Sequence, residues 1–171
     1  LFRLACQIDA MLMPDASAYR SLWLSTDSQT PSTPDVEAPE QNGIYGPAFL
    51  PHKLKIGLAL PEDNCVDVYA QDISLLMSHR DGHVDGYEVL VGGGMSMMPS
   101  VPRNSPRLAQ PLAFVSPSQV MDVIWAIVEV YRDFGDRSRQ SEARLKYLVA
   151  DRGIENFGRL VQSRLGWKLS D

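Results

Sequence analysis

The chain has 171 residues, of which 44% are hydrophobic and 22% are charged, a composition that is ordinary for a globular domain with a sizeable core. Its net charge of −5 argues against a general nucleic-acid-binding protein, which would carry a basic excess. The longest apolar stretches are too short to span a membrane, and Leu1 is not followed by a secretory pattern. We therefore expect a segment of a longer, cytoplasmic polypeptide with no nucleic-acid or membrane partner.

The two cysteines restrict the metal chemistry of the chain. Cys6 and Cys65 provide neither a disulfide framework nor the paired spacing of a metal-binding motif. An iron–sulfur cluster held by thiolates alone needs more cysteines than these. We therefore assign no metal ligand to this chain.

The N-terminal segment, residues 1–24, is predicted to be helical. Apolar residues at helical spacing indicate a helix over residues 1–13, and a second short helix is predicted to end near Leu24. Residues 25–47 are rich in Ser, Thr, Pro, Asp and Glu and poor in apolar residues, which is typical of a linker or a long surface loop. Residues 48–171 then form the main module.

A strand is predicted over residues 52–60, where apolar and polar residues alternate. One face carries Leu54, Ile56, Leu58 and Leu60. Lys53 and Lys55 share the other face, and their ammonium groups, about 7 Å apart, would repel by roughly 2 kcal/mol at an effective dielectric near 20. Such a pair indicates either a bound anion or the solvated face of an edge strand, where lysines discourage further pairing. From the strand alone we favour the solvated face.

Residues 72–80 and 84–91 are predicted to form a β-hairpin, because two strand-like runs flank the turn sequence Asp81-Gly82. His79 and His83 lie beside this turn and could indicate a metal. A hairpin tip is solvated and no further ligand is evident, so we favour two surface histidines.

Asp67 and Asp72 precede the hairpin and could form a pair of catalytic carboxylates. Aspartates in such positions more often cap turns or accept hydrogen bonds from backbone amides. We therefore favour a structural role for both.

The hairpin ends in Gly92-Gly93-Gly94. Glycines allow positive φ and close approach of the backbone to a flat ligand, and their amides can form an anion-binding concavity. The run lacks the spacing of a dinucleotide-binding fingerprint. In the loop that follows, Arg107, and with less support Arg103, could pair with a carboxylate of a ligand, although solvated arginines are the alternative.

Three helices are predicted in the C-terminal third. Ser116 and Gln119 form a capping-box pattern before a helix that ends at Gly135, and apolar periodicity indicates further helices over residues 140–152 and 154–165. These helices would cover a mixed β-sheet of about four or five strands, with the N-terminal helices at its edge. The predicted fold class is therefore α+β.

Arg137, Arg144 and Lys146 form a basic patch near the start of one predicted helix. The patch could contact a cofactor or another part of the longer polypeptide. It could also be a solvated face that pairs with nearby acidic side chains, and we favour this second interpretation. Those acidic side chains are Asp133, Asp136 and Glu142.

Six stretches, taken in chain order, resemble the sulfite reductase hemoprotein family, the assimilatory sulfite and nitrite reductases that use siroheme coupled to an iron–sulfur cluster. They are residues 50–61, 61–72, 86–97, 106–115, 131–137 and 143–148. The resemblance runs from about residue 44 to the end of the chain and more weakly through residues 1–24. It corresponds to the first of the two larger catalytic modules of these enzymes.

The resemblance implies a parent enzyme that reduces sulfite to sulfide by six electrons, or nitrite to ammonia, on siroheme. Lys53 and Lys55 match the lysines of the family's anion pocket, so they would bind sulfite or nitrite and help deliver protons, and Lys53 would also contact the cofactor. The Gly92-Gly93-Gly94 run would lie along siroheme, and Arg107 would be a further cofactor contact.

The resemblance also implies partners. In the family, the cysteines of the 4Fe-4S cluster lie in the second half of the protein, outside the part that this sequence matches. Electrons would reach that cluster from a flavoprotein or a ferredoxin. The isolated chain is therefore expected to be inactive without the other parts of the same polypeptide.

Three departures from the family pattern support an alternative. His52 stands where an arginine is common, residues 97–100 replace a threonine–histidine–glycine–asparagine run, and Asp136 stands where asparagine is common. A diverged, non-catalytic module used for interaction or scaffolding would tolerate these changes. The retained Lys53 and Lys55 pair favours the enzyme, either a sulfite reductase or a nitrite reductase of the same family.

Overall fold

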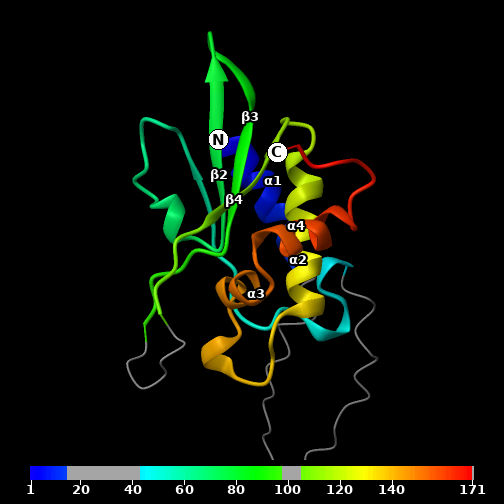
Figure 1. Ribbon diagram of the computed structural model, residues 1–171. Helices are drawn as coiled ribbons and strands as arrows, with labels where there is room; N and C mark the ends of the chain where they lie inside the picture. The colour runs from blue at the N-terminus through cyan, green and yellow to red at the C-terminus, as the bar shows by residue number, and fades with distance from the viewer. Residues whose placement is uncertain (15–42, 98–104, 171) are drawn as a thin grey trace, which may run out of the picture.

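The computed structural model describes residues 1–14, 43–97 and 105–170 (Figure 1). Within these ranges, four strands form one mixed sheet in the order β1-β2-β3-β4, with β1 parallel to β2 and the other neighbours antiparallel. The strands are β1 (Ile56–Ala59), β2 (Ile73–Arg80), β3 (His83–Val91) and β4 (Gln110–Val115). This architecture is α+β and confirms the predicted fold class and strand number.

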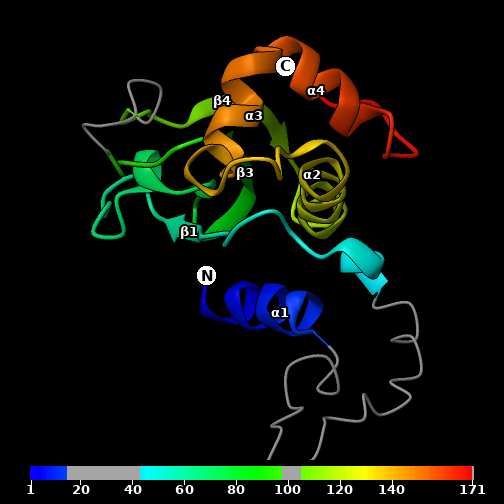
Figure 2. The same ribbon diagram turned by 90° about the horizontal axis from the view of Figure 1, so that it is seen from below.

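In the described ranges, four α-helices pack around this sheet. They are α1 (Phe2–Leu12), α2 (Val120–Phe134), α3 (Leu145–Arg152) and α4 (Ile154–Gln162), with short 3₁₀ segments η2 (Gly43–Ala48), η3 (Val68–Ala70) and η4 (Gln140–Glu142). Figure 2 shows α2, α3 and α4 grouped against the sheet, while α1 lies by itself on the side of β1. The C-terminal helices therefore cover the sheet as predicted, with the N-terminal helix at its edge.

The main hydrophobic core lies between the sheet and α2. Side chains at alternating strand positions face the helices, and α1 adds Leu4 and Ile8 to the same core. The strand residues that are completely buried there are Ile73, Leu75, Val89 and Val91. Each completely buried aliphatic side chain contributes about 1.5–3 kcal/mol relative to full exposure. A smaller apolar cluster below η3 contains Ala59, Val68, Leu90 and Ala109.

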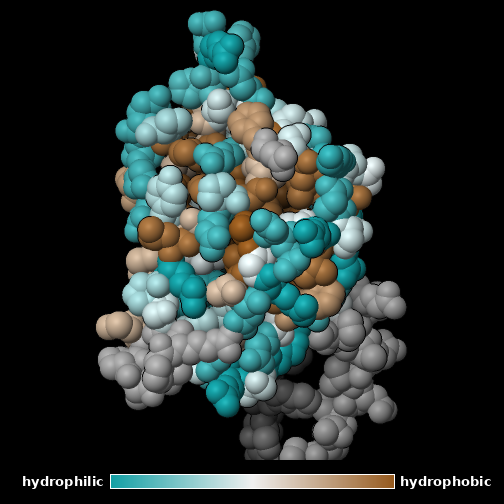
Figure 3. All heavy atoms as spheres, in the orientation of Figure 1, coloured by the Kyte–Doolittle hydropathy of each residue, from teal (hydrophilic) through white to brown (hydrophobic). Residues whose placement is uncertain are grey.

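The β2–β3 hairpin matches its prediction closely. Asp81 and Gly82 occupy the turn with φ of 51° and 78°, the two positive values that a type I′ turn requires. The tip of the hairpin is hydrophilic (Figure 3). There His79 lies 3.7 Å from a carboxylate oxygen of Glu62, and His83 is exposed.

Strand β1 is shorter than the predicted strand over residues 52–60. Its pairing with β2 begins only at Ile56, opposite Ile73, so Lys53 and Lys55 precede the strand rather than lie within it. The backbone N–H of Lys55 donates instead to the carboxylate of Asp72 at 3.0 Å. A side chain therefore takes the place of a ladder partner, and this ends the regular pairing.

Strand β4 was not predicted, because Pro111 interrupts its polar and apolar alternation. Proline is tolerated there since β4 lies at the edge of the sheet, where one side of the strand needs no ladder partner. The predicted helix over residues 140–152 is in fact divided into η4 and α3. The last helix ends at Gln162, earlier than the predicted residue 165.

The predictions for the N-terminal region are tested only in part. The first predicted helix is confirmed as α1, whereas the second one, near Leu24, falls outside the described residues. In the predicted linker, residues 43–48 form η2, whose Ile44 is buried in the main core. No helix within residues 1–14, 43–97 and 105–170 is long and apolar enough to cross a membrane.

Candidate functional site

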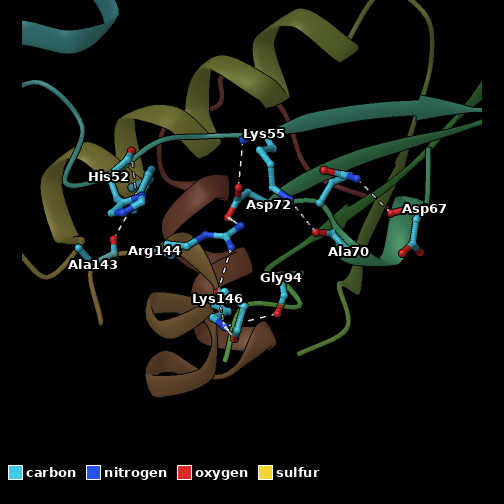
Figure 4. Close-up of polar contacts among 12 residues, drawn as sticks. His52, Lys55, Asp67, Ala70, Asp72, Gly94, Ala143, Arg144 and Lys146 are labelled. Atoms are coloured by element: carbon cyan, nitrogen blue, oxygen red, sulfur yellow. Dashed lines mark hydrogen bonds and ion pairs between the residues drawn. The ribbon is translucent and has the colours of Figure 1, made fainter. Parts of the chain in front are cut away.

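Four basic residues lie near the place where β3 ends and α3 begins. Figure 4 shows Lys55, Arg144 and Lys146, and Arg107 lies beside Gly94 at the end of the glycine run. We call this group the cation cluster, and it consists of Lys55, Arg107, Arg144 and Lys146. The residues come from three separate segments of the chain, since Arg144 and Lys146 are two positions apart, and the fold brings these segments to one end of the sheet. Asp72, at the start of β2, is the carboxylate that lies among them.

Asp72 is completely buried and uses both carboxylate oxygens. Oδ2 accepts the backbone N–H of Lys55 at 3.0 Å, and Oδ1 accepts Nη2 of Arg144 at 2.7 Å. The Arg144 side chain is itself only 9% exposed. A buried carboxylate is tolerated only when it is paired and hydrogen-bonded, and these two contacts supply that condition.

Lys146 is also completely buried, yet within residues 1–14, 43–97 and 105–170 it has no carboxylate partner. Its Nζ donates to the carbonyl oxygens of Ser105 at 2.8 Å and Ser96 at 2.9 Å, with a longer contact to Gly94 O at 3.4 Å. Burial lowers the pKa of Lys146, the positive charges of Arg144 and Arg107 lower it further, and only Asp72 opposes them. The amine is therefore hydrogen-bonded but electrostatically crowded by cations.

The two predicted anion-binding lysines have different surroundings. Lys55 is half-buried, and its Nζ donates to Ala70 O at 3.3 Å, so it joins the cluster through Asp72 and η3. Lys53 is exposed and lines a hollow of about 430 Å³ with His52 and the aromatic residue Phe49. That both amines bind one anion stays a prediction.

The triple glycine is buried and its amides are engaged by the protein. Gly92 N donates to Asp72 O at 2.9 Å, Gly93 N to Gln71 O at 3.0 Å and Gly94 N to Arg107 O at 2.8 Å. These amides therefore have no hydrogen left for an anion, and the concavity that the sequence suggested is not formed by them. The positive φ of 84° at Gly92 confirms the conformational reason for glycine there.

Close packing explains the other two glycines. A Cβ added to Gly93 would lie 2.5 Å from Gln71 O, and one added to Gly94 would lie 2.9 Å from Nη1 of Arg144. The glycine run therefore lets the backbone pass close to η3 and to the cation cluster. Contact of this run with a flat ligand stays a prediction.

Two arginines of the cluster keep a polar atom without a partner. Arg107 is half-buried and pairs with Gly94 through backbone hydrogen bonds, but its Nε is buried with no acceptor in the described part of the chain. Nε of Arg144 is in the same condition. Buried donors of this kind normally have a partner, so they indicate an acceptor such as a carboxylate of a bound group. Arg103 lies outside the described residues.

The solvated basic patch predicted from Arg137, Arg144 and Lys146 is wrong for two of its members. Arg144 and Lys146 are buried, and Arg144 pairs with Asp72 rather than with the nearby acids. Arg137 alone is exposed, where it donates to backbone oxygens of Phe49 and Arg132. The signal that was missed is the run of apolar neighbours around both residues, all of them buried. They are Ala143, Leu145, Tyr147, Leu148 and Val149.

The structural role favoured for Asp72 is confirmed, since it accepts a backbone amide. Asp67 adopts a left-handed conformation with φ of 52° before η3, and its carbonyl oxygen accepts the amide of Ala70 at 2.9 Å. No group of three or more His, Cys, Asp or Glu side chains that could hold a metal occurs in the described ranges. Cys6 and Cys65 are both exposed, on α1 and in the segment before η3.

Comparison with protein families is decisive. A model described as "Nitrite and sulphite reductase 4Fe-4S domain" matches residues 5–169. The chain belongs to this family. The resemblance seen in the sequence is thereby confirmed.

Curated relatives extend the match within the nitrite and sulphite reductase family. The chain is 42% identical over 160 residues to a "Sulfite reductase [NADPH] hemoprotein beta-component" of Geobacillus thermodenitrificans, with 94% of this chain and 28% of the relative covered. A protein of the same description from Acidithiobacillus ferrooxidans is 39% identical over 166 residues, which cover 97% of this chain and 28% of that protein. The chain thus spans little more than a quarter of the length of these relatives.

A solved structure agrees with the family assignment. The Mycobacterium tuberculosis NirA protein superposes with a TM-score of 0.61 at 32% sequence identity, over 73% of this chain and 22% of that one. The fold and the family therefore agree.

The two cofactors expected for the nitrite and sulphite reductase family fit this chain unequally. The unpartnered Nε atoms of Arg107 and Arg144, together with the crowded ammonium of Lys146, suit the carboxylates of a tetrapyrrole such as siroheme. A 4Fe-4S cluster held by cysteines does not fit, because the chain has two cysteines. Any cluster ligands must therefore come from other polypeptide.

Proposed function

We propose that the chain is the siroheme-associated module of a sulfite reductase hemoprotein, with nitrite as the alternative substrate of the same reaction class. The observation that carries the proposal is the cation cluster around Asp72, in a chain whose relatives carry the description of sulfite reductase hemoprotein components. An anionic substrate and an anionic cofactor would both be attracted to this end of the sheet. The activity would belong to the longer polypeptide.

In this proposal, Lys55 and Lys53 bind the substrate anion. Lys55 is half-buried and its amine is held by one carbonyl contact at 3.3 Å, which leaves donors of the ammonium for an anion. Each oxygen that leaves sulfite or nitrite as water takes up protons, and an ammonium hydrogen-bonded to that oxygen can supply one. Lys53 is exposed beside His52 and would complete the site from the solvent side.

The cofactor would be held by the other members of the cluster. Siroheme, when bound, would supply the iron on which the anion is reduced. Arg107, through its unpartnered Nε, would pair with a cofactor carboxylate, and the Gly92-Gly93-Gly94 run would contact the flat macrocycle. Lys146 lies among these groups, and a cofactor carboxylate near it would offset the crowding of positive charge.

Electrons would come from outside this chain. The names of the relatives include NADPH, so we propose an NADPH-linked flavoprotein as the donor, with a ferredoxin as the alternative. The 4Fe-4S cluster would be bound by cysteines elsewhere in the longer polypeptide.

The test is expression of the longer polypeptide together with siroheme synthesis, followed by methyl-viologen-driven reduction of sulfite and of nitrite. The variants Lys53→Ala and Lys55→Ala should keep the siroheme absorption while turnover falls by orders of magnitude. Lys168→Ala removes an exposed lysine of the C-terminal tail and serves as the matched control. Wild-type turnover in both variants, or absence of siroheme from the unaltered protein, would contradict the proposal and favour a non-catalytic module.

A further inference from the structure

Lys55 is fixed at three points, all supplied by the short segment that leads into β2. Its N–H donates to Asp72 Oδ2 at 3.0 Å, its C=O accepts the N–H of Ile73 at 3.1 Å, and its Nζ donates to Ala70 O at 3.3 Å. Lys55 lies immediately before β1, and its C=O takes part in the first hydrogen bond of the β1–β2 ladder. The Asp72 carboxylate therefore adds a side-chain anchor at the point where regular strand pairing begins.

The carboxylate of Asp72 joins Lys55 to the opposite side of the site. Its second oxygen accepts Nη2 of Arg144 at 2.7 Å, and Nη1 of Arg144 reaches Ser96 Oγ at 3.4 Å. The same guanidinium fills the space beside Gly94, where a Cβ would lie 2.9 Å from Nη1. Asp72 thus connects Lys55 to Arg144, and through Arg144 to the end of the glycine run at Gly94.

We propose that Asp72 is a positioning residue that sets the place of the Lys55 ammonium for the substrate anion. This inference rests on the role proposed above for Lys55. Asp72 does not reach the anion itself, because both of its oxygens are occupied and its side chain has no exposed surface. It acts through the backbone of Lys55.

Because each oxygen of Asp72 accepts from a different residue, Asp72→Asn can remove one of the two hydrogen bonds and keep the other. An amide side chain offers one acceptor and one donor group, whereas the carboxylate offers two acceptors. Arg144, as the charged and closer donor, would keep the remaining oxygen, so the amide NH₂ would face the N–H of Lys55. Lys55 would then lose its anchor, while the volume at position 72 stays the same.

A second substitution should restore the anchor. In Asp72→Asn combined with Arg144→Met, the guanidinium no longer competes, so the amide oxygen can accept the N–H of Lys55. A purely structural role for the Asp72–Arg144 ion pair predicts no such rescue, because the pair is absent from the double variant.

The measurement is the rate at which an amine-specific reagent labels each lysine of the longer polypeptide, followed by mass spectrometry. The chain contains its own standards, since Lys53 and Lys168 are both exposed. In the unaltered protein Lys55 should react more slowly than Lys53. In Asp72→Asn the rate at Lys55 should rise about threefold to tenfold, the equivalent of one ordinary hydrogen bond, with Lys53 and Lys168 unchanged.

The double variant should return the Lys55 rate toward its original value. The KM for sulfite should rise in Asp72→Asn relative to the unaltered protein, with both proteins compared at the same siroheme content. Equal changes at Lys53, Lys55 and Lys168 would show general loosening of the fold and overturn the proposal, as would an unchanged Lys55 rate.

Two further results keep this inference separate from the proposed function. If Asp72→Asn does not fold, hydrogen exchange on the unaltered protein decides: the Lys55 amide should be protected although it lies outside a strand, and rapid exchange would overturn the proposal. If Lys55→Ala keeps full turnover, the proposed function fails even where the labelling pattern holds. If Lys55→Ala is inactive but the labelling rate of Lys55 is the same in Asp72→Asn as in the unaltered protein, only the positioning role of Asp72 fails.

Discussion

A buried and a surface ion pair in this protein have similar distances between their charged atoms but differ in exposure to solvent. Asp72 and Arg144 are 2.7 Å apart with exposed fractions of 0% and 9%, whereas Asp133 lies 2.8 Å from Arg164 with exposed fractions of 30% and 34%. The surface pair is screened by solvent and salt, while the buried pair depends on each partner to compensate the other's desolvation. Burial of a pair, rather than the distance between its atoms, therefore decides how much the loss of one partner destabilises the fold.

The largest expected effect is the loss of the buried acid. Asp72→Ala should lower the free energy of unfolding by about 3–5 kcal/mol, because it leaves Arg144 charged and unpaired in the interior. Asp133→Ala, the matched change at the surface, should cost no more than about 1 kcal/mol. Urea unfolding followed by circular dichroism gives both values, and equal costs would remove the distinction between the two groups.

The next effect concerns the buried amine. Lys146→Met should lower the free energy of unfolding by about 1–3 kcal/mol at neutral pH, because the carbonyl oxygens of Ser96 and Ser105 lose their donor. The pH dependence gives a second check. Since the pKa of Lys146 is lowered in the folded protein, the unfolded chain holds that proton to higher pH than the folded chain does.

Unfolding free energy should therefore contain a contribution that rises with pH between the lowered pKa and the ordinary lysine value of about 10.4. Lys146→Met should lack this contribution, so the difference between the two proteins should widen across that range. A difference that stays constant with pH would show that the Lys146 amine is not perturbed.

A smaller effect is expected at the glycines. Gly94→Ala would place a Cβ 2.9 Å from Nη1 of Arg144, and since a side-chain end can shift, we expect a loss of about 1 kcal/mol, at the low end for overpacking. Gly158→Ala in α4 is the control, because its Cβ would meet only Leu112 at an ordinary 3.5 Å. That change should stabilise the helix by about 0.5–1 kcal/mol. Thermal unfolding of the two variants should move in opposite directions.

The smallest effect belongs to the surface acid. A hydrogen bond from Arg132 lowers the pKa of Asp133, so its contribution to stability is present above the ordinary aspartate value and is lost as pH falls through the lowered one. The difference between the original protein and Asp133→Asn should therefore disappear at strongly acidic pH. It should also shrink in about 1 M salt, where exposed charges are screened.

The contrast between the two ion-pair groups also marks the limit of what the sequence could predict. Local signals were sufficient for the hairpin at Asp81-Gly82 and for the end of α2 at Gly135, whereas α2 begins at Val120, later than the predicted cap at Ser116. They also led to the family through ordered motifs. The late start of β1 at Ile56 coincides with the contact of the Asp72 carboxylate with Lys55, residues that are 17 positions apart, and no local pattern contains it.

The same reason explains the error at Arg144 and Lys146. Charged residues at a helix start are usually solvated, and acids nearby in sequence were the obvious partners. The actual partner of Arg144 lies 72 positions away, and the amine of Lys146 is held by carbonyl oxygens, which every residue carries. The placement of Lys55, by contrast, was predicted as part of a site, but its support by Asp72 became visible only in three dimensions.

The most direct test is a crystal structure of the siroheme-loaded longer polypeptide with sulfite bound. The account predicts that an oxygen of the anion lies within hydrogen-bonding distance of Lys55 Nζ, about 3 Å, while Asp72 still accepts the N–H of Lys55. An anion bound elsewhere, with Lys55 Nζ still directed only at Ala70 O, would contradict it.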